Sequence, residues 1–188
     1  MACSHCGKCQ AHPQKAASVS EALRQRRPWV LGALARSCGI SEQEAAWELP
    51  EEMRAFAPGW AFEEIWKEIC AWDRAVFVSQ QGGFGWKWSG RIPEGKAVQG
   101  IYHFAGEGAM SGHVRLDAIS GICFLSLPFM GKECHSVQFF DAQGGVMFAV
   151  HVGKIEGRIS PSARDSFLAM RGRFCSRPAF DIPMYKAG

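Results

Sequence analysis

Residues 121–152 read GICFLSLPFMGKECHSVQFFDAQGGVMFAVHV, and this stretch decides the fold. It contains three apolar runs, at about 121–128, 135–141 and 145–152. The residues between the runs include Gly, Pro and Asp, which are favoured in turns. Short apolar runs between turn signals are typical of antiparallel strands that follow one another in a sheet. We therefore expect a β-meander here, with a tight hairpin at 141–145.

The two-residue period of the apolar side chains extends upstream to about residue 75. A first strand leads through a glycine hairpin at 82–83 into a second strand. The second strand places three aromatic side chains on one face: Phe84, Trp86 and Trp88. Such a row is more often a core face than a platform for a ligand. Further strands are expected at about 97–105 and 112–118, so the whole sheet is predicted to be an antiparallel meander.

The residues before the sheet have the period of helices. An apolar stripe predicts a helix over about 30–38 that ends at a glycine. Ser41 and Glu44 form a capping box that begins a second, short helix. A connection with a proline at each end, at 50–58, leads to a third helix over about 61–72.

At 188 residues, the chain has the length of one domain with short extensions. Ser160 and Pro161 predict the start of a last helix, because Ser caps helices and Pro is favoured in a first turn.

The patterns together predict an α+β fold, with an N-terminal helical segment packed on the antiparallel meander and a C-terminal helix. The expected division is a cysteine-rich tail at 1–17, one domain at 18–172 (helical part 18–73, sheet part 75–153, C-terminal helix 160–172) and a tail at 173–188.

Composition narrows the class of protein. The net charge of +3 is too small to argue for nucleic acid by itself. No apolar run reaches the ~18–20 residues of a membrane span, and the start MACSHC lacks the pattern of a signal peptide. We therefore expect a cytoplasmic protein whose eight cysteines are reduced or bound to metal. The seven Trp and thirteen Phe could fill a core or line a site for a flat aromatic ligand.

Residues 110–117 read MSGHVRLD and follow a glycine-rich turn. In a strand, His113 and Arg115 share one face because successive side chains alternate. An imidazole beside a guanidinium could form a ligand pair, the first for a metal or haem iron and the second for a carboxylate. An ordinary solvated strand face has the same pattern, so these residues alone leave both interpretations open.

Five blocks occur in order along the chain: a Gly-aromatic strand at 100–104, Met-Ser-Gly-His at 110–113, Phe-Met-Gly at 129–131, a strand and hairpin at 136–145, and a strand that ends at Gly153. This ordered set resembles the ChuX/HutX family of bacterial haem-utilisation proteins, and with weaker similarity upstream the resemblance covers about residues 30–155. It implies the haem-iron-utilisation protein-like fold and a cytosolic homodimer that binds haem b. It also implies a carrier that passes imported haem to a downstream haem-degrading enzyme during iron acquisition.

The resemblance also implies which residues contact haem. His113 lies in a matched block and is the first candidate for the iron. Tyr102 is the second, because relatives can use a tyrosine from this strand and ferric iron accepts a phenolate ligand. His103 is the alternative on the same strand. Neighbouring side chains of a strand face opposite sides, so if the alignment with relatives is shifted by one residue, His103 and not Tyr102 faces the haem.

Phe129, Met130 and Gly131 form another matched block. Gly131 would let the backbone approach a flat ligand, and Met130 could pack against it. Arg91, Arg115 and Lys132 are candidates for pairing with the haem propionates. A bend at a strand end and ordinary surface charges are the alternative interpretations of these residues.

Gln80 is a departure from the family pattern. Some relatives carry a histidine near this position of the first strand, and a glutamine is a poor haem ligand. Coordination of the iron by two histidines is therefore not expected. His135 and His151 fall in other strands, and we interpret them as structural.

The N-terminal tail contains a possible tetrahedral metal set. Cys3, Cys6 and Cys9 are spaced by three, and His12 follows three residues later. The set could hold Zn or contribute to an iron–sulfur centre, although an iron–sulfur centre needs a further ligand. A disordered tail with adventitious cysteines is the alternative, and the tail has no match in the haem family.

Two other functions have to be weighed against the carrier. A haem-degrading or haem-modifying enzyme could share the fold, but the chain shows no nucleophile–base pair or phosphate loop. A helix-turn-helix DNA-binding regulator could use residues 30–48. The second helix of that segment is acidic and carries no Arg or Lys for phosphates or guanines, which favours a helical unit that caps the sheet.

Overall fold

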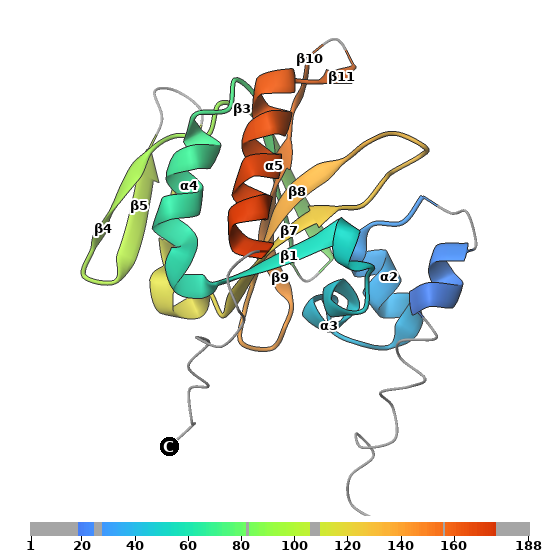
Figure 1. The fold of residues 1–188 in the computed structure, drawn as a ribbon. Helices are drawn as coiled ribbons and strands as arrows, with labels where there is room; N and C mark the ends of the chain where they lie inside the picture. The colour runs from blue at the N-terminus through green and yellow to red at the C-terminus, as the bar shows by residue number, and fades with distance from the viewer. Residues whose placement is uncertain (1–18, 25–27, 82, 106–109, 156, 176–188) are drawn as a thin grey trace, which may run out of the picture.

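The computed structural model describes residues 19–24, 28–81, 83–105, 110–155 and 157–175 (Figure 1). The helices are residues 19–24, α2 (Leu31–Cys38), α3 (Glu42–Trp47), α4 (Phe62–Cys70) and α5 (Pro161–Cys175). The strands are β1 (Arg54–Pro58), β2 (Ala75–Gln81), β3 (Phe84–Gly90), β4 (Gly95–Val98), β5 (Ile101–Ala105), β6 (Ser111–Arg115), β7 (Gly121–Ser126), β8 (His135–Phe140), β9 (Val146–Val152), β10 (Lys154–Ile155) and β11 (Arg158–Ile159). None of the described helices is both long enough and apolar enough to span a membrane.

Six strands form the main sheet, in the order β1-β7-β8-β9-β2-β3, and every neighbouring pair is antiparallel. The three apolar runs that decide the fold are β7, β8 and β9, and they occupy its middle. β4, β5 and β6 form a second antiparallel sheet. The predicted α+β class, with antiparallel strands and a C-terminal helix, is confirmed.

The segment 50–58 contains an edge strand, where the sequence predicted only a connection. β1 pairs with β7 from Arg54 opposite Leu125 to Pro58 opposite Gly121. Alternate residues of β1 are buried, but the buried ones are alanines, so the apolar period is weak in the sequence. Pro58 is tolerated because it ends a strand at the edge of the sheet.

The segment 97–105 is two strands and not one. Gln99 and Gly100 have φ angles of 51° and 77°, so the chain turns back between β4 and β5. A positive φ is uncommon for a residue other than glycine, which is why Gln99 gave no turn signal. The turn separates β4, β5 and β6 from the main sheet.

α4 and α5 lie side by side over one face of the main sheet (Figure 1). Phe62 and Trp66 of α4 contact the ring of Phe139, with centroid distances of 5.6 and 6.4 Å. Phe167 of α5 contacts Phe124 at 5.8 Å. These five side chains are at most 1% exposed. Burial of each contributes roughly 2 to 3 kcal/mol, so this face is the main core of the protein.

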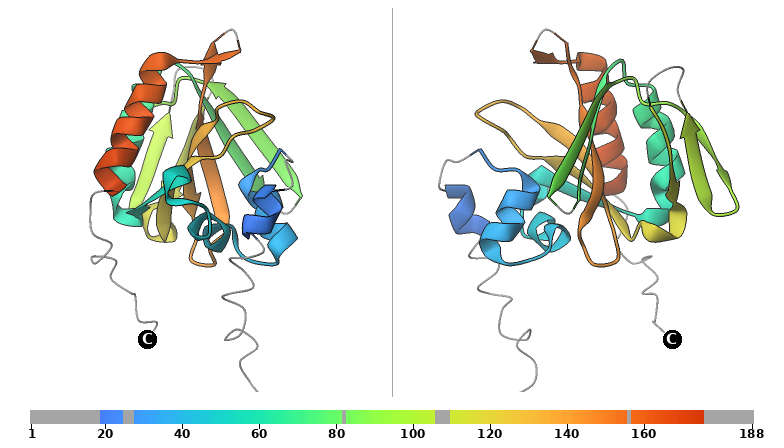
Figure 2. Two further views of the ribbon diagram at one scale, coloured as in Figure 1. Left: turned by 45° about the vertical axis from the view of Figure 1, so that its right-hand side comes forward. Right: turned by 180° about the vertical axis from the view of Figure 1, so that it is seen from behind.

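α2 and α3 lie against the opposite face, at one end of the sheet (Figure 2). Leu34 of α2 packs in one apolar cluster with Leu125 and Phe140 of the sheet. The Glu42 carboxylate accepts a hydrogen bond of 2.6 Å from the Val146 N–H. The helical unit thus caps part of the sheet. This is the arrangement that the sequence favoured over a DNA-binding helix-turn-helix.

The predicted capping box at the start of α3 is present. The Glu44 N–H donates to Ser41 Oγ at 3.1 Å, and the Ser41 N–H donates to Glu44 Oε2 at 2.9 Å. α2 ends at Gly39, whose φ of 64° is the left-handed conformation that favours glycine. The Gln43 N–H donates to Gly144 O at 2.9 Å and joins α3 to the β8–β9 turn.

Substitution of Gly59 by Ala tests the packing of β1 and α4 on the rest of the fold. A Cβ atom at this position would lie 1.9 Å from the carbonyl oxygen of Ile119. We expect Gly59→Ala to lower the free energy of unfolding by about 2 to 3 kcal/mol, because backbone has to move.

The matched control is Gly172→Ala in α5, where an added Cβ meets nothing within 4 Å. This variant is expected to be neutral or stabilised by up to about 1 kcal/mol through helix propensity. Urea unfolding measures both changes. Equal stabilities of the two variants would contradict the close approach at Gly59.

Candidate functional site

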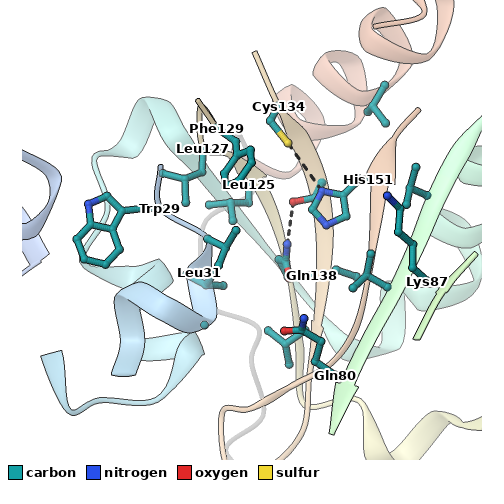
Figure 3. Close-up of a pocket in the computed structure, with 18 of the residues that line it drawn as sticks. Trp29, Leu31, Gln80, Lys87, Leu125, Leu127, Phe129, Cys134, Gln138 and His151 are labelled. Carbon is teal, nitrogen blue, oxygen red and sulfur yellow. Dashed lines mark hydrogen bonds between the residues drawn. The ribbon is translucent and has the colours of Figure 1, made fainter. Parts of the chain in front are cut away.

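A pocket of about 560 Å³ lies on the second face of the main sheet, next to the segment that leads into α2 (Figure 3). Phe77, Phe139 and Val150 point to the helix-covered face, so the residues that alternate with them line the pocket. Its apolar lining consists of Trp29, Val30, Leu31, Val76, Val78, Leu125, Leu127, Phe129, Val146, Ala149 and Val152. A volume in the range of ~300–1,000 Å³ and a mainly apolar lining are typical of small-molecule sites.

The pocket has a floor of strands and a separate side wall. Figure 3 shows Trp29 and Leu31 on one side and Lys87 of β3 on the other, with the central strands between them. The Trp29 indole N–H donates to the Ala22 carbonyl oxygen at 2.8 Å, which holds the ring in place. The wall is therefore built by the segment before α2, whose position depends on the helical unit.

His151 of β9 lies in the floor of the pocket, beside two buried polar residues of β8, Ser136 and Gln138, which hydrogen-bond to each other at 2.7 Å. Its Nδ1 atom lies 3.8 Å from the Sγ atom of Cys134 (Figure 3). Burial lowers the pKa of the His151 imidazole to about 4, and the positive charge of Lys87 also lowers it. Burial raises the pKa of the Cys134 thiol, although Lys154 opposes the change. Near neutral pH the pair is a neutral imidazole beside a neutral thiol, and not a thiolate–imidazolium nucleophile.

Cationic side chains lie among the lining residues. Arg74, Lys87 and Lys154 are all exposed, so their charges face the solvent around the pocket. Glu42 is the carboxylate among the lining residues, and it already accepts the hydrogen bond from Val146. An anionic group at the mouth would therefore meet positive charge on the side of β2 and β3.

The predicted histidines lie on the other sheet, outside this pocket. His103 of β5 and His113 of β6 are directly opposite each other, and their ring centroids are 6.0 Å apart. Both side chains are exposed. The structure thus brings together the first candidate and the alternative on one open face.

Tyr102 points the other way, into the main core. Its ring contacts Phe62 at 5.1 Å and Trp66 at 6.2 Å, and it is 5% exposed. Burial raises the pKa of its phenol, with a smaller contribution from the nearby Cys70. The phenolate that would bind ferric iron is therefore disfavoured at this position.

Arg115 is already paired within its own strand region. Its guanidinium donates to both carboxylate oxygens of Asp117, at 3.0 and 2.7 Å. The pairing raises the pKa of Arg115 and lowers that of Asp117. The pair is on the surface, so a propionate would have to compete with Asp117 for the guanidinium.

The turn at 129–132 borders the pocket. Phe129 and Lys132 exchange two backbone hydrogen bonds of 3.0 Å, and Met130 and Gly131 both have positive φ angles, 53° and 71°. This is the geometry of a two-residue hairpin turn. Of the predicted site residues, Phe129 lines the pocket, while the Met130 side chain is 69% exposed.

The predicted metal set, Cys3, Cys6, Cys9 and His12, lies outside the described residues. Within the described ranges, no group of three or more His, Cys, Asp or Glu side chains could hold a metal ion. Zn or an iron–sulfur centre in the tail stays a prediction.

Comparison with known proteins places most of the chain in one family. The family model for haem utilisation ChuX/HutX matches residues 55–170. The chain belongs to this family. The resemblance found in the sequence blocks is therefore confirmed.

Individual relatives agree with the match. "Intracellular heme transport protein HutX" of Vibrio cholerae is 31% identical over 155 residues, which are 81% of this chain and 80% of that protein. The crystal structure of ChuX is 22% identical, has a TM-score of 0.76 and is matched over 83% of this chain and 97% of its own. ChuS, an E. coli heme oxygenase, is 13% identical with a TM-score of 0.71, over 84% of this chain and 48% of that chain. The two structures show that the fold is shared.

Sequence reasoning missed most of the pocket. His151 was interpreted as structural, and Trp29, Cys134 and Lys87 were not considered. One signal was present: Val76, Val78 and Ala149 are apolar on the face opposite Phe77 and Phe148, so both faces of these strands are apolar. A sheet with two apolar faces needs a cover or a ligand on each.

The low pKa of His151 predicts how stability depends on pH. An unfolded histidine has a pKa of about 6.5, so above that value both states are neutral and pH has no effect through this group. As the pH falls toward 4, the unfolded chain takes up the proton first and the folded state is destabilised. The loss through His151 is on the order of 2 to 3 kcal/mol.

Urea unfolding at about pH 7.5 and about pH 4.5 measures this loss. We expect the protein to lose more stability than its His151→Leu variant over that interval. Gln80→Leu, at the exposed end of the same pocket, introduces the same side chain without removing a titrating group and should keep the original pH dependence. If the free energy of unfolding fell by the same amount in the protein and in His151→Leu, the assignment of a neutral imidazole would be contradicted.

Proposed function

We propose that this chain binds haem b inside the cell and carries imported haem to a haem-degrading enzyme. The observation that carries the proposal is the family membership together with 31% identity, over four fifths of the chain, to a protein named as an intracellular heme transport protein. A carrier has to enclose an apolar macrocycle and release it again. It does not have to supply catalytic groups of its own.

The pocket supports this function by its chemistry. A porphyrin needs an apolar slot and an open edge at which its propionates reach solvent and cations. The lining has an apolar floor, and Arg74, Lys87 and Lys154 are exposed around it. These residues fit an anionic, mainly apolar ring.

We propose that the exposed pair of histidines contacts haem during uptake or release. His113 remains the first candidate and His103 lies beside it, so either imidazole can meet the iron of an arriving haem. A site on an open face holds its ligand loosely, as a step in transfer requires. Tyr102 would have to leave the core to reach the iron, so it ranks after the two histidines.

The homodimer is also a proposal. β3 is an edge strand of the main sheet, and it exposes 71% of Phe84 and 41% of Trp86. An apolar exposed edge is favourable for pairing with a second copy. Light scattering that gives twice the mass of one chain would support the dimer, and the mass of one chain would contradict it.

A haem titration tests the carrier function. We expect ferric haem to produce a saturable Soret band, and ascorbate with oxygen to leave the porphyrin intact. Uptake by the His103→Ala/His113→Ala variant should be slower by a factor of about 2 to 10 in stopped-flow absorbance, because a contact on the route is lost.

The matched control is Lys96→Ala, which changes the exposed residue opposite His103 on β4. Its uptake rate is expected to equal that of the unmodified protein. Haem binding no stronger than that of an unrelated protein would end the carrier proposal. A biliverdin-like product would favour the enzyme instead.

A further inference from the structure

His151 stands apart from the other histidines of the described chain. His103 and His113 are on the outer face of the second sheet, and the His135 ring stacks on Phe167 of α5 at 4.9 Å. Of the four histidines in the described residues, His151 alone lines the pocket. A purely structural role would not explain why this imidazole lines a mainly apolar pocket.

We propose that the pocket on the second face of the main sheet is the resting site of haem and that the Nε2 atom of His151 is its iron ligand. The proposal rests on the haem-binding function proposed above. In this proposal His151 binds the iron of haem that is enclosed in the pocket. His103 and His113, on the exposed face of the second sheet, contact haem during uptake or release.

The environment of the imidazole suits a metal ligand. A histidine bound to a metal uses one ring nitrogen for the ion and the other for a neighbouring group that orients the ring. Nδ1 of His151 faces Cys134 at 3.8 Å, and no hydrogen-bond partner of Nε2 is found among the described residues. Nε2 is therefore the ring nitrogen that is left for a metal.

Cys134 is the competing ligand in the same pocket. Thiolates bind haem iron, and Cys134 also lines the pocket. Its sulfur lies against His151, where it can orient the imidazole. The position of the thiol therefore suits a supporting role.

The side chains around His151 are small or branched and leave room for a flat ring. Val76 is directly opposite His151 on β2, and Ala149 lies on the same face of β9 two residues earlier. Val78 is opposite Ala149 on β2. These three positions give an apolar surface without long side chains on the β2 side of the imidazole, while Ser136 of β8 is opposite His151 on the other side.

The cations near this floor match the two propionates of haem. Lys87 of β3 and Lys154 of β10 both line the pocket. Both lysines are exposed, so they can pair with carboxylates that reach solvent. The ring would thus have its polar edge on the side of these lysines.

Three variants of the full chain test the assignment, with ferric haem and metal-free protoporphyrin IX as the two probes. His151→Gln removes the iron ligand but keeps a polar group beside Cys134. Val78→Trp fills the floor of the pocket and leaves residue 151 a histidine. Val98→Trp makes the same change on exposed β4 and serves as the matched control.

We expect His151→Gln to bind ferric haem about 10- to 100-fold more weakly and with a shifted Soret band. Its affinity for metal-free protoporphyrin should stay within about twofold, because that ring has no iron to ligate. Val78→Trp should weaken binding of both porphyrins, and Val98→Trp of neither. Circular dichroism of each apo-protein reports whether it is folded.

The outcomes separate this assignment from the carrier function. If the unmodified protein binds no ferric haem, the carrier function fails and the assignment fails with it. If that protein binds haem and His151→Gln binds it equally well, the assignment alone is overturned. Equal weakening of both porphyrins by His151→Gln would show that the residue acts by packing, and tight binding by Val78→Trp would show that haem rests elsewhere.

Discussion

Both faces of the central strands carry apolar side chains, and this is the constraint on which the rest of the structure depends. Phe139 and Val150 face α4 and α5, and Ala149 and the β2 valines face the other way. Each face has to be covered, because exposed apolar surface of this extent is unfavourable in water. The helices α4 and α5 complete the first face. Among the described residues, helices cover the second face at one end, where α2 and α3 pack, and the pocket lies next to them.

The docking of α3 decides how much of the second face stays open. The capping box fixes the start of α3, and hydrogen bonds from Gln43 to Gly144 and from Val146 to Glu42 attach it to the β8–β9 turn. These contacts hold the helical unit at one end of the sheet. The segment before α2 then places Trp29 beside the floor, so the wall of the pocket follows from the position of α3. A ligand in the pocket would complete the cover that the helices leave unfinished.

Local patterns made much of the fold predictable. The apolar runs predicted β7, β8 and β9. Gly39 predicted the end of α2, and the capping box of Ser41 and Glu44 predicted the start of α3. The strand β1 was missed because its buried residues are alanines, and the turn at Gln99 was missed because its backbone is unusual for a glutamine. In both places tertiary pairing outweighs the local signal.

The candidate site was harder to predict because its residues meet only through pairing between distant strands. His151 and Val76 are opposite each other in β9 and β2, and Cys134 reaches them from the turn before β8. No spacing in the sequence places these three together. The family blocks identified His113, which lies on an open surface, and gave no sign of the imidazole inside. Family membership therefore indicated the ligand, whereas the pairing of strands indicated where that ligand can be enclosed.

The position of the iron atom tests the central claim most directly. Diffraction from crystals of the haem complex at the iron absorption edge gives an anomalous peak at the metal. The account predicts a peak in the pocket, at bonding distance from Nε2 of His151. A peak beside His103 and His113, with no iron in the pocket, would contradict it.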